Sequence, residues 1–337
     1  MSDITKIKGT LVAETEKAVL IKFASGKVVW IPKSTLKAEF NSDKSISQFF
    51  SIATWILEKN EVIIDVGSLV KKIIEILNTR HADNLIAIYG IGSYFDDNLP
   101  PNWIKKDIDL ILVVKSLEKI PKEHWDKRFY SEEIEGYEIF SGYNTLEMYQ
   151  NKEKFKEFSG ANYEWAIIEL RLSENSRLLF GEDIRNQLPK ISDLSFDYDD
   201  ILARGFYHIE KSLKEQENKA MWELSKAIFK ISFYVCKYFI EDFSSTSVIV
   251  IGKKLKDVVE MISQLKEFGN FFSEAVEYRT TGKYETEFKS LRVKFITHLV
   301  SSLKSGALHR KIEDQELKLF LITHFRGFPN LIRFLKI

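Results

Sequence analysis

Cysteine is nearly absent from this chain of 337 residues, since Cys236 is the single one. One cysteine excludes a disulfide framework within the chain and a zinc site built on cysteines, and it is typical of a reducing cytosol. The six histidines are scattered and do not show the spacing of metal ligands. We therefore expect no metal site built on cysteine or histidine.

Long apolar runs and an excess of one charge are also missing. No stretch approaches the run of about 18 apolar residues that a membrane helix needs, and the first residues lack the apolar segment of a signal peptide. We therefore expect a cytoplasmic protein with no membrane partner. The 49 basic and 49 acidic residues balance, so net charge argues neither for nor against nucleic acid as a partner. Phosphate-binding loops of the Walker A and G-x-G-x-x-G types are absent as well.

What the chain has in abundance is apolar and aromatic side chains, with 45% hydrophobic residues, 25 phenylalanines and 13 tyrosines. This composition is typical of a globular protein, and the length allows two or three domains, each with its own core. Patterns along the chain predict an α+β fold in three parts. These are a small β-rich, barrel-like unit with a closing helix in residues 1–60, a mixed-sheet domain in residues 61–188, and an α-helical bundle in residues 198–337.

The N-terminal part has the alternation typical of β structure. Residues 18–23 and 27–31 flank a turn and predict a hairpin, which Pro32 ends. Apolar residues between positions 47 and 59 recur with helical spacing and predict the closing helix. Trp30 is expected in the core of this unit, with contact to nucleic acid or a partner as the alternative. The unit resembles small OB- or SH3-like barrels at the level of fold, which settles nothing about function.

The stretch from 85 to 115 predicts two apolar strands joined by a polar connection, and the second strand opens with two carboxylates. Alternate side chains of a strand share a face, so Asp107 and Asp109 point the same way and Ile108 turns into the core. Neighbouring carboxylates repel each other unless a cation lies between them. An all-oxygen site of this kind favours Mg²⁺ or Mn²⁺.

A Gly92-Ser93 turn follows the first of these strands, and we expect it to start a helix. Such a turn presents backbone N–H groups and a hydroxyl, which are suited to binding an anion. A metal site beside an anion site predicts that the chain binds the phosphates of a nucleotide.

Gly92-Ser93, thirteen further residues and then Asp107-Ile108-Asp109 resemble the nucleotidyltransferase superfamily typified by DNA polymerase beta. The gap lies at the long end of that family's range, and the resemblance covers residues 62–184, about a third of the chain. The resemblance implies that Asp107 and Asp109 are catalytic and bind two Mg²⁺ (or Mn²⁺) ions. It also implies that Gly92 and Ser93 hold the β- and γ-phosphates of an NTP.

The family places a third carboxylate on a neighbouring strand, and Glu138, in the expected strand 136–141, is our choice by position. Glu138 would then be a third catalytic residue and metal ligand. The alternative is that it is a solvated residue on an edge strand. The rival carboxylate is Glu169, but residues 166–170 are expected to be helical.

The C-terminal part is expected to be almost entirely helical, with helices at 200–217, 219–241, 253–268, 284–304 and 313–336. The helix 219–241 has two nearly opposite apolar stripes, which predicts burial on both sides. Lysines run along one seam of this helix. In related enzymes a lysine of the helical domain reaches the triphosphate, which implies nucleotide binding by Lys226, with Lys219 as second choice. The alternative is a solvated seam of lysines.

Two other features receive no assigned function. Arg204 and His208 superficially resemble the Arg…His pair of helical HEPN ribonucleases, but only three residues separate them, which is short of that motif. Lys105 and Lys106 precede Asp107 and could steady phosphates, but exposed loop lysines usually have no specific role.

The resemblance implies a Mg²⁺-dependent nucleotidyltransferase. It would move an NMP, with AMP the preferred group, from an NTP to a hydroxyl of an acceptor, which could be a small molecule, an RNA or a protein. The alternative is a non-catalytic nucleotide- or RNA-binding module, or an antitoxin-like interaction module, that keeps the fold. The sequence does not indicate which NTP, which acceptor or which oligomeric state applies.

Overall fold

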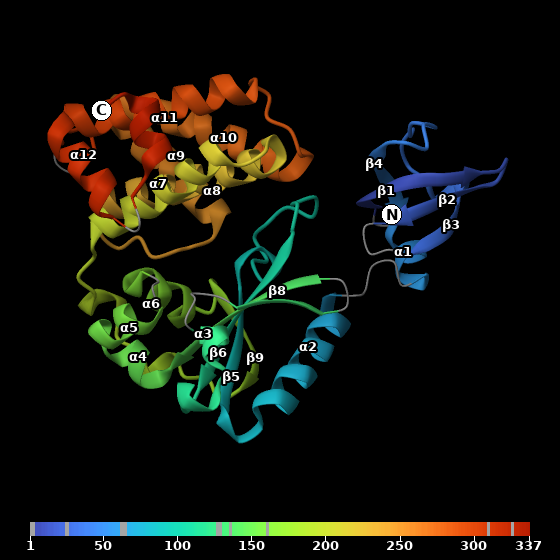
Figure 1. Ribbon diagram of the computed structural model, residues 1–337, viewed down its shortest axis with the longest axis horizontal. Coiled ribbons are helices and arrows are strands. Elements are labelled where there is room, and N and C mark those ends of the chain that lie inside the picture. The colour runs from blue at the N-terminus through green and yellow to red at the C-terminus, as the bar shows by residue number, and fades with distance from the viewer. Residues whose placement is uncertain are drawn as a thin grey trace. The chain divides into compact units, whose positions relative to one another are not determined.

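A computed structural model describes residues 4–23, 27–60, 66–125, 130–134, 137–159, 162–308, 311–324 and 327–337. Contacts within the chain divide it into two compact units. The first comprises Met1–Ala82 with Glu133–Tyr137, and the second comprises Asp83–Glu132 with Glu138–Ile337. The chain is mixed α and β, with two sheets and a helical C-terminal region (Figure 1). None of the helices in the described ranges is both long and apolar enough to span a membrane.

The first unit contains a four-stranded antiparallel sheet with the strand order β3-β2-β1-β4. The strands are β1 (Ile4–Glu14), β2 (Ala18–Phe23), β3 (Val28–Pro32) and β4 (Ser47–Ala53). The predicted hairpin is confirmed as β2 and β3, while its turn at 24–26 lies outside the described residues. One face of the sheet carries a core of fully buried side chains that includes Leu11, Val19, Ile21, Ile31, Phe50 and Ile52.

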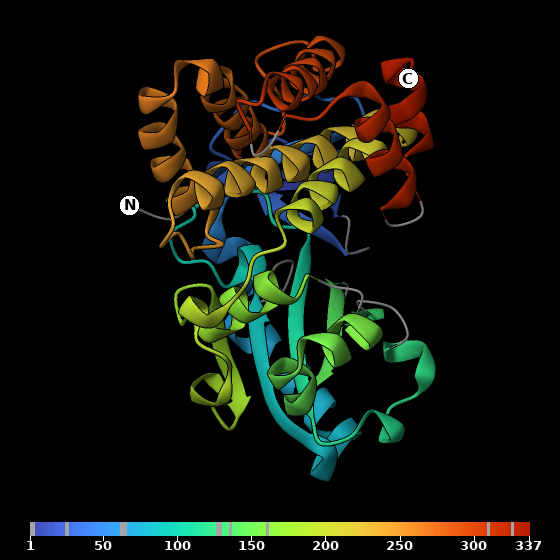
Figure 2. The same ribbon diagram turned by 90° about the vertical axis from the view of Figure 1, so that its left-hand side faces the viewer.

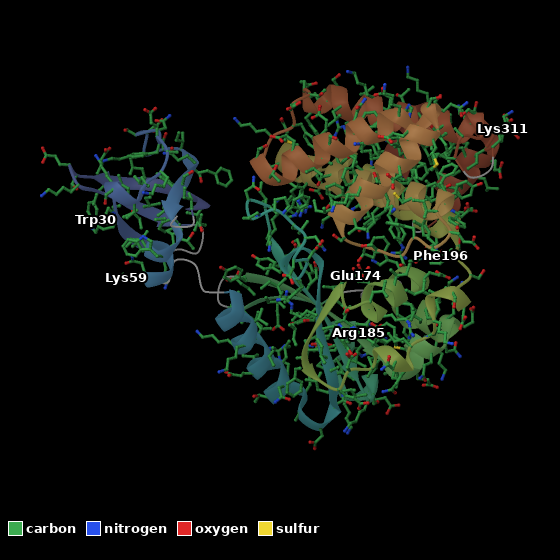
Figure 3. The ribbon with its side chains drawn as sticks, turned by 180° about the vertical axis from the view of Figure 1, so that it is seen from behind. Trp30, Lys59, Glu174, Arg185, Phe196 and Lys311 are labelled. Carbon is green, nitrogen blue, oxygen red and sulfur yellow. The ribbon has the colours of Figure 1, made fainter. Side chains whose placement is uncertain are left out.

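The predicted closing helix is wrong in its first half. Residues 47–53 form β4, and the helix α1 covers only Thr54–Lys59. Phe50 and Ile52 alternate with more exposed neighbours and pair with β1. The prediction was wrong because a strand period of two and a helix period of 3.6 are hard to tell apart in an apolar run of this length. Trp30 is not a core residue, since it is 47% exposed on the side of β3 opposite to buried Ile31 (Figure 3). The helix α2 (Val66–His81) completes this unit.

The second sheet has five strands in the order β7-β8-β6-β5-β9. They are β5 (Leu85–Ile91), β6 (Asp107–Val114), β7 (Tyr130–Ile134), β8 (Tyr137–Thr145) and β9 (Ser176–Gly181). β5 is antiparallel to β6 and β9, whereas β6 and β8 are parallel. The two strands expected around the polar connection are therefore confirmed as β5 and β6, and they lie next to each other in the sheet.

One face of this sheet is covered by α4 (Leu146–Gln150), α5 (Lys152–Ser159) and α6 (Tyr163–Arg171). Their apolar side chains share one core cluster with Tyr89 of β5 and with Ile111 and Val113 of β6. The segment after β9 is held to the same sheet, because the Tyr89 hydroxyl accepts a hydrogen bond from the Ile184 N–H (2.8 Å). Arg185 then donates to the carbonyls of Leu170 and Ser176 (Figure 3). A short helix, α3 (Lys122–Trp125), lies between β6 and β7.

The C-terminal region consists of seven helices in the described ranges, which lie together in the yellow-to-red part of Figure 2. They are α7 (Tyr198–Lys214), α8 (Glu217–Phe239), α9 (Val248–Met261), α10 (Lys266–Thr281), α11 (Phe288–Ser305), α12 (Asp314–Thr323) and α13 (Pro329–Leu335). The burial of α8 on both sides is confirmed, since Leu224 and Ile228 of one stripe and Phe229 and Phe233 of the other are all buried.

Two of the predicted helices have wrong bounds. Residues 253–268 do not form one helix, because α9 ends at Met261 and α10 begins at Lys266 after a 3₁₀ turn. The predicted helix 313–336 is divided into α12 and α13. The break carries Gly327 with a positive φ of 76° and Pro329, which starts α13 without a backbone donor.

Candidate functional site

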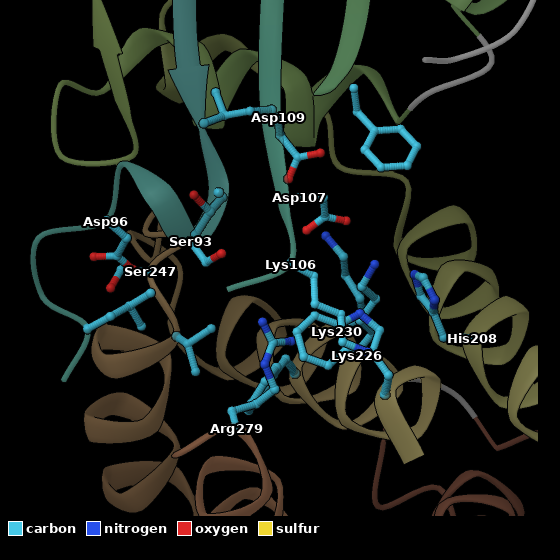
Figure 4. A pocket seen from close by; sticks show the side chains of 18 of the residues that line it. Ser93, Asp96, Lys106, Asp107, Asp109, His208, Lys226, Lys230, Ser247 and Arg279 are labelled. Carbon is cyan, nitrogen blue, oxygen red and sulfur yellow. The ribbon is translucent and has the colours of Figure 1, made fainter. Parts of the chain in front are cut away.

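A cavity of about 840 Å³ lies within the second unit, and the residues singled out in the sequence line it. Its walls come from the ends of β5, β6 and β8, from α6 to α8, from the start of α9 and from Arg279 of α10. The lining includes all of the predicted site residues, namely Gly92, Ser93, Asp107, Asp109, Glu138, Lys226 and Lys219. Figure 4 shows Asp107 and Asp109 pointing into the space that Lys226, Lys230 and Arg279 enter from the helices.

The two aspartates open β6 and share one of its faces. Asp107 and Asp109 are partly buried, while Ile108 between them is fully buried on the opposite face. Farther along the strand the same face continues with Ile111 and Val113, which lie under α4–α6. Alternation along the strand therefore brings one face from the apolar core into the cavity within a few residues.

The Gly92-Ser93 turn is held against the second aspartate. Gly92 has a φ of +72°, and a β-carbon built on it would lie 2.8 Å from Oδ2 of Asp109. The helix expected to start here is a 3₁₀ helix of only three residues, Gly92–Tyr94. The ring of Phe95 packs back over Gly90, where an added β-carbon would be 2.5 Å from it.

Glu138 lies beside Asp107, since the parallel register of β6 and β8 pairs these two residues. Its side chain is exposed, and its carboxylate accepts a hydrogen bond from the Ser131 hydroxyl of β7 at 3.0 Å. The rival carboxylate, Glu169, also lines the cavity, and it lies on the helix α6 as expected. Glu138 thus has the neighbouring-strand position that the resemblance requires, with its carboxylate engaged by Ser131.

The fit of a divalent metal ion can be tested on these side chains. In the described ranges no group of three or more His, Cys, Asp or Glu side chains lies close enough to hold a metal ion. Mg²⁺, however, is commonly bound by one or two carboxylates and completed by substrate phosphates and water. Asp107 and Asp109 supply two such carboxylates on one face, next to a glycine turn. The residues therefore fit a Mg²⁺ ion that is completed by a bound nucleotide.

Cationic side chains converge on one aromatic ring in the cavity wall. Cζ of Arg279 lies 3.6 Å from the ring centroid of buried Trp222, and Nζ of Lys106 lies 4.0 Å from it. Lys226, one turn along α8, is 5.9 Å from the same centroid. Partial burial lowers the pKa of Lys106, and the positive charges of Arg279 and Lys226 lower it further. The expectation that Lys106 is an ordinary loop lysine therefore missed its place in a cationic cluster.

Arg279 is the most buried of these cations, with 6% of its surface exposed. It joins α10 to the segment between β5 and β6, since the Ile104 N–H donates to the Arg279 carbonyl (2.6 Å) and the guanidinium donates to the Ile104 carbonyl (3.3 Å). Burial lowers its pKa to about 10, against the opposing effect of Asp107, so it stays charged at neutral pH. Its Nε has no acceptor in the described part of the chain. Sequence reasoning missed Arg279, because nothing in its local pattern marks it.

His208 also lines the cavity, but not as a partner of Arg204. Nδ1 of His208 lies 2.7 Å from Oε2 of Glu223, while Arg204 donates to Asp200. Burial lowers the pKa of His208 to about 4, although Glu223 opposes the shift. The imidazole is therefore neutral at pH 7, and Nδ1–H donates to the carboxylate. Sequence reasoning considered His208 only as a partner of Arg204, and nothing in the sequence indicated its pairing with Glu223.

The lysine seam of α8 separates into two groups. Lys219, Lys226 and Lys230 line the cavity, with Nζ of Lys230 3.1 Å from the ring centroid of Trp165. Lys237 is buried elsewhere, where its Nζ lies 4.3 Å from the ring centroid of Phe196. The predicted lysines are therefore on the cavity side of the helix.

Comparison with models of known protein families finds no match to this chain, and neither does comparison with curated protein sequences.

Proposed function

We propose that this protein is a Mg²⁺-dependent nucleotidyltransferase that moves an NMP, with AMP the preferred group, from an NTP to a hydroxyl acceptor. The observation that carries the proposal is that three groups line one cavity: the Gly92-Ser93 turn, the aspartates on one face of β6, and a cationic wall. The cationic wall consists of Lys106, Lys226 and Arg279. These groups lie directly after β5, at the start of β6 and on α8 and α10. They match the three needs of phosphate transfer, which are an anion-binding turn, metal ligands and charge neutralisation.

The proposal extends to the fold and the setting. The sheet of β5, β6 and β8 with its covering helices would be a nucleotidyltransferase-type core, and the N-terminal sheet would be a small barrel-like unit. The cytoplasm, where NTPs are abundant, would be the setting of the reaction.

The phosphates would lie between the Gly92-Ser93 turn and the cationic wall. Backbone N–H groups of the turn and the Ser93 hydroxyl would bind the β- and γ-phosphates, as helix and turn N–H groups commonly do. Lys106, Lys226 and Arg279 would neutralise the negative charge of the triphosphate and of the departing pyrophosphate. Little covalent chemistry is asked of the protein, so positioning and charge neutralisation would supply most of the rate.

Asp107 and Asp109 would hold the metal, with Glu138 turning from Ser131 to complete the set. Bound there, Mg²⁺ lowers the pKa of an acceptor hydroxyl and neutralises charge on the phosphates. The acceptor would be a small molecule, an RNA or a protein, with its hydroxyl directed at the face that Asp107 shares with Asp109.

The second candidate is a nucleotide-binding module without catalysis. The observation in its favour is that Glu138 is hydrogen-bonded to Ser131 and that no three-carboxylate cluster exists in the described ranges. Such a module would bind an NTP through the turn and the cations and transfer nothing.

Thermal unfolding in the presence of each of the four NTPs, with and without Mg²⁺, tests the proposal. A ligand at one hundred times its dissociation constant stabilises the native state by about 2.7 kcal/mol. We expect a Mg²⁺-dependent rise in Tm with at least one NTP, lost in Asp109→Asn and kept in Asp257→Asn, which changes an exposed aspartate on α9. No shift with any NTP would contradict both candidates. A shift without transfer of label from the NTP would favour the binding module.

A further inference from the structure

His208 is the one histidine among the described residues that line the cavity, and it enters from α7. Its side chain keeps 17% of its surface exposed while the cavity is empty. Figure 4 shows its ring directed into the same space as Asp107 of β6 and the lysines of α8. A ligand in the cavity can therefore reach the imidazole.

Glu223 fixes which nitrogen of this ring carries the proton. Although burial raises the pKa of Glu223, the bond from His208 lowers it, so the carboxylate is ionised and can only accept hydrogen bonds. Since Nδ1 lies 2.7 Å from Oε2 of Glu223, the neutral ring has its N–H at Nδ1 and its lone pair at Nε2. Glu223 is held in turn by Lys211, whose Nζ lies 4.0 Å from Oε1.

Nε2 of His208 is the free end of this pair. In the described part of the chain the one hydrogen bond of the ring is made by Nδ1. Nε2 nevertheless keeps accessible surface, whereas the unpartnered ring nitrogens of His124 and His298 are buried. A lone pair on an accessible nitrogen, in a ring fixed from behind by a carboxylate, is the arrangement that accepts a proton from a hydroxyl.

The His208–Glu223 pair lies near the aspartates of β6. Burial lowers the pKa of Lys106, whereas the charges of Asp107 and Glu223 both raise it. Lys106 immediately precedes Asp107, and its Nζ lies 4.0 Å from the ring centroid of Trp222, the residue before Glu223. The pair and Asp107 are therefore both neighbours of one ammonium group and surround the same part of the cavity.

We infer that His208 is the general base that takes the proton of the acceptor hydroxyl, and that Glu223 is the positioning residue that holds its ring. The inference rests on the proposed function, because it assigns a further residue to the same reaction. The hydroxyl gives its proton to Nε2, and its oxygen forms a bond to the α-phosphorus of the NTP. The bond from this phosphorus to the oxygen that bridges to the β-phosphate breaks, and pyrophosphate leaves with the electron pair. The proton on Nε2 then passes to water.

The charges around the ring suit this role. Burial lowers the pKa of His208 to about 4, Glu223 opposes the shift, and Lys226 and Lys230 lower the pKa further. A triphosphate paired with these lysines offsets their charge and raises the pKa toward the neutral range, where a base is most effective. The ring is therefore neutral before the NTP binds and more basic afterwards.

Transfer of label from an α-³²P-labelled NTP into a cell extract, used as the pool of acceptors, tests the inference. His208→Gln keeps a donor to Glu223 and has no basic nitrogen, so the initial rate should fall by about a hundredfold or more. The Mg²⁺-dependent rise in Tm with the NTP should persist, which shows that the variant is folded and binds the nucleotide. The matched control is His324→Gln, which changes a histidine at the end of α12 outside the cavity lining. It should transfer at the wild-type rate.

Two further variants separate a base from a structural residue. Imidazole added to the solution should restore part of the transfer by His208→Ala, because the shortened side chain leaves room for it, and it should not change the rate of the His324→Gln control. Glu223→Gln should lower the rate by about tenfold or more in the wild-type background and no further in His208→Gln, since Glu223 acts through the ring.

The outcomes distinguish this inference from the proposed function. Transfer by His208→Gln at the wild-type rate, or a loss that matches weaker NTP binding, would overturn the role of His208 and leave the nucleotidyltransferase proposal standing. A further loss on adding Glu223→Gln to His208→Gln would overturn the role of Glu223. Absence of transfer by the wild type would instead remove the proposed function together with the inference.

Discussion

Gly92 and Asp109 are so close that a β-carbon on Gly92 would lie 2.8 Å from Oδ2 of the aspartate. The φ of +72° at Gly92 adds a second reason for glycine, because other residues adopt this region only with strain. The turn that would hold phosphates and the carboxylate that would hold metal are therefore one structural unit. A change at either position should disturb both.

Gly92→Ala should lower the free energy of unfolding by about 1–3 kcal/mol, from the positive φ and the contact with Asp109 together. It should also weaken Mg²⁺-dependent NTP binding, since the carboxylate must move. Gly269→Ala on α10 is the control, because its nearest neighbour would be 3.5 Å away and its φ is not positive. Denaturant unfolding and NTP titration measure both effects. Equal behaviour of the two variants would show that the contact is unimportant.

Asp107→Asn should abolish nucleotide transfer and leave the fold intact. The amide cannot supply the charge that a divalent metal requires, and losses of at least about a hundredfold are usual when such an electrostatic element is removed. The measurement is transfer of label from an α-³²P-labelled NTP into the small-molecule, RNA and protein fractions of a cell extract. The labelled fraction also names the acceptor class. Wild-type transfer by this variant would refute the assignment of metal ligands.

Lys226→Met should weaken binding of an NTP and of tripolyphosphate to the same extent, by about tenfold, because the lysine would act on the phosphates. The control is Lys256→Met, which changes an exposed lysine on α9. Binding should also weaken with rising salt, and the salt dependence should be smaller in the Lys226 variant. Unchanged tripolyphosphate affinity would remove Lys226 from the phosphate site.

Stability should fall on acidification because of His208. Its pKa is about 4 in the folded protein, owing to burial, against an ordinary value of 6.5. Between these values the unfolded chain binds a proton that the folded chain does not, so unfolding becomes easier as pH falls from about 6.5 to about 4. One proton gives a slope of up to about 1.4 kcal/mol per pH unit.

The His208→Gln variant isolates this contribution, since carboxylates that titrate in the same range are common to both proteins. Denaturant unfolding at several pH values should show a shallower dependence in the variant than in the wild type. The same slope in both would mean that His208 is protonated in the folded state.

Local alternation was enough to predict the centre of the candidate site. β5 and β6 are apolar runs bounded by polar residues and glycine, which was enough to predict two strands. The shared face of Asp107 and Asp109 follows from the strand period of two. The helix expected at the Gly92-Ser93 turn is present only as a 3₁₀ helix of three residues. The helix predicted at 47–59 was wrong for residues 47–53, because the pairing of these residues with β1 is not visible in the local pattern.

The sequence by itself thus determined the mixture of α and β structure with a helical C-terminal region, the strand bearing two carboxylates and the lysines of the central helix. Only the tertiary structure brought Arg279, Trp222 and His208 to the same cavity. The physical reason is range: alternation and helical periodicity act over a few residues, and each strand or helix forms its own pattern. Which side chains meet across α8, α9 and α10 depends on how whole helices pack their apolar faces. That packing cannot be predicted from the residue pattern of a single segment.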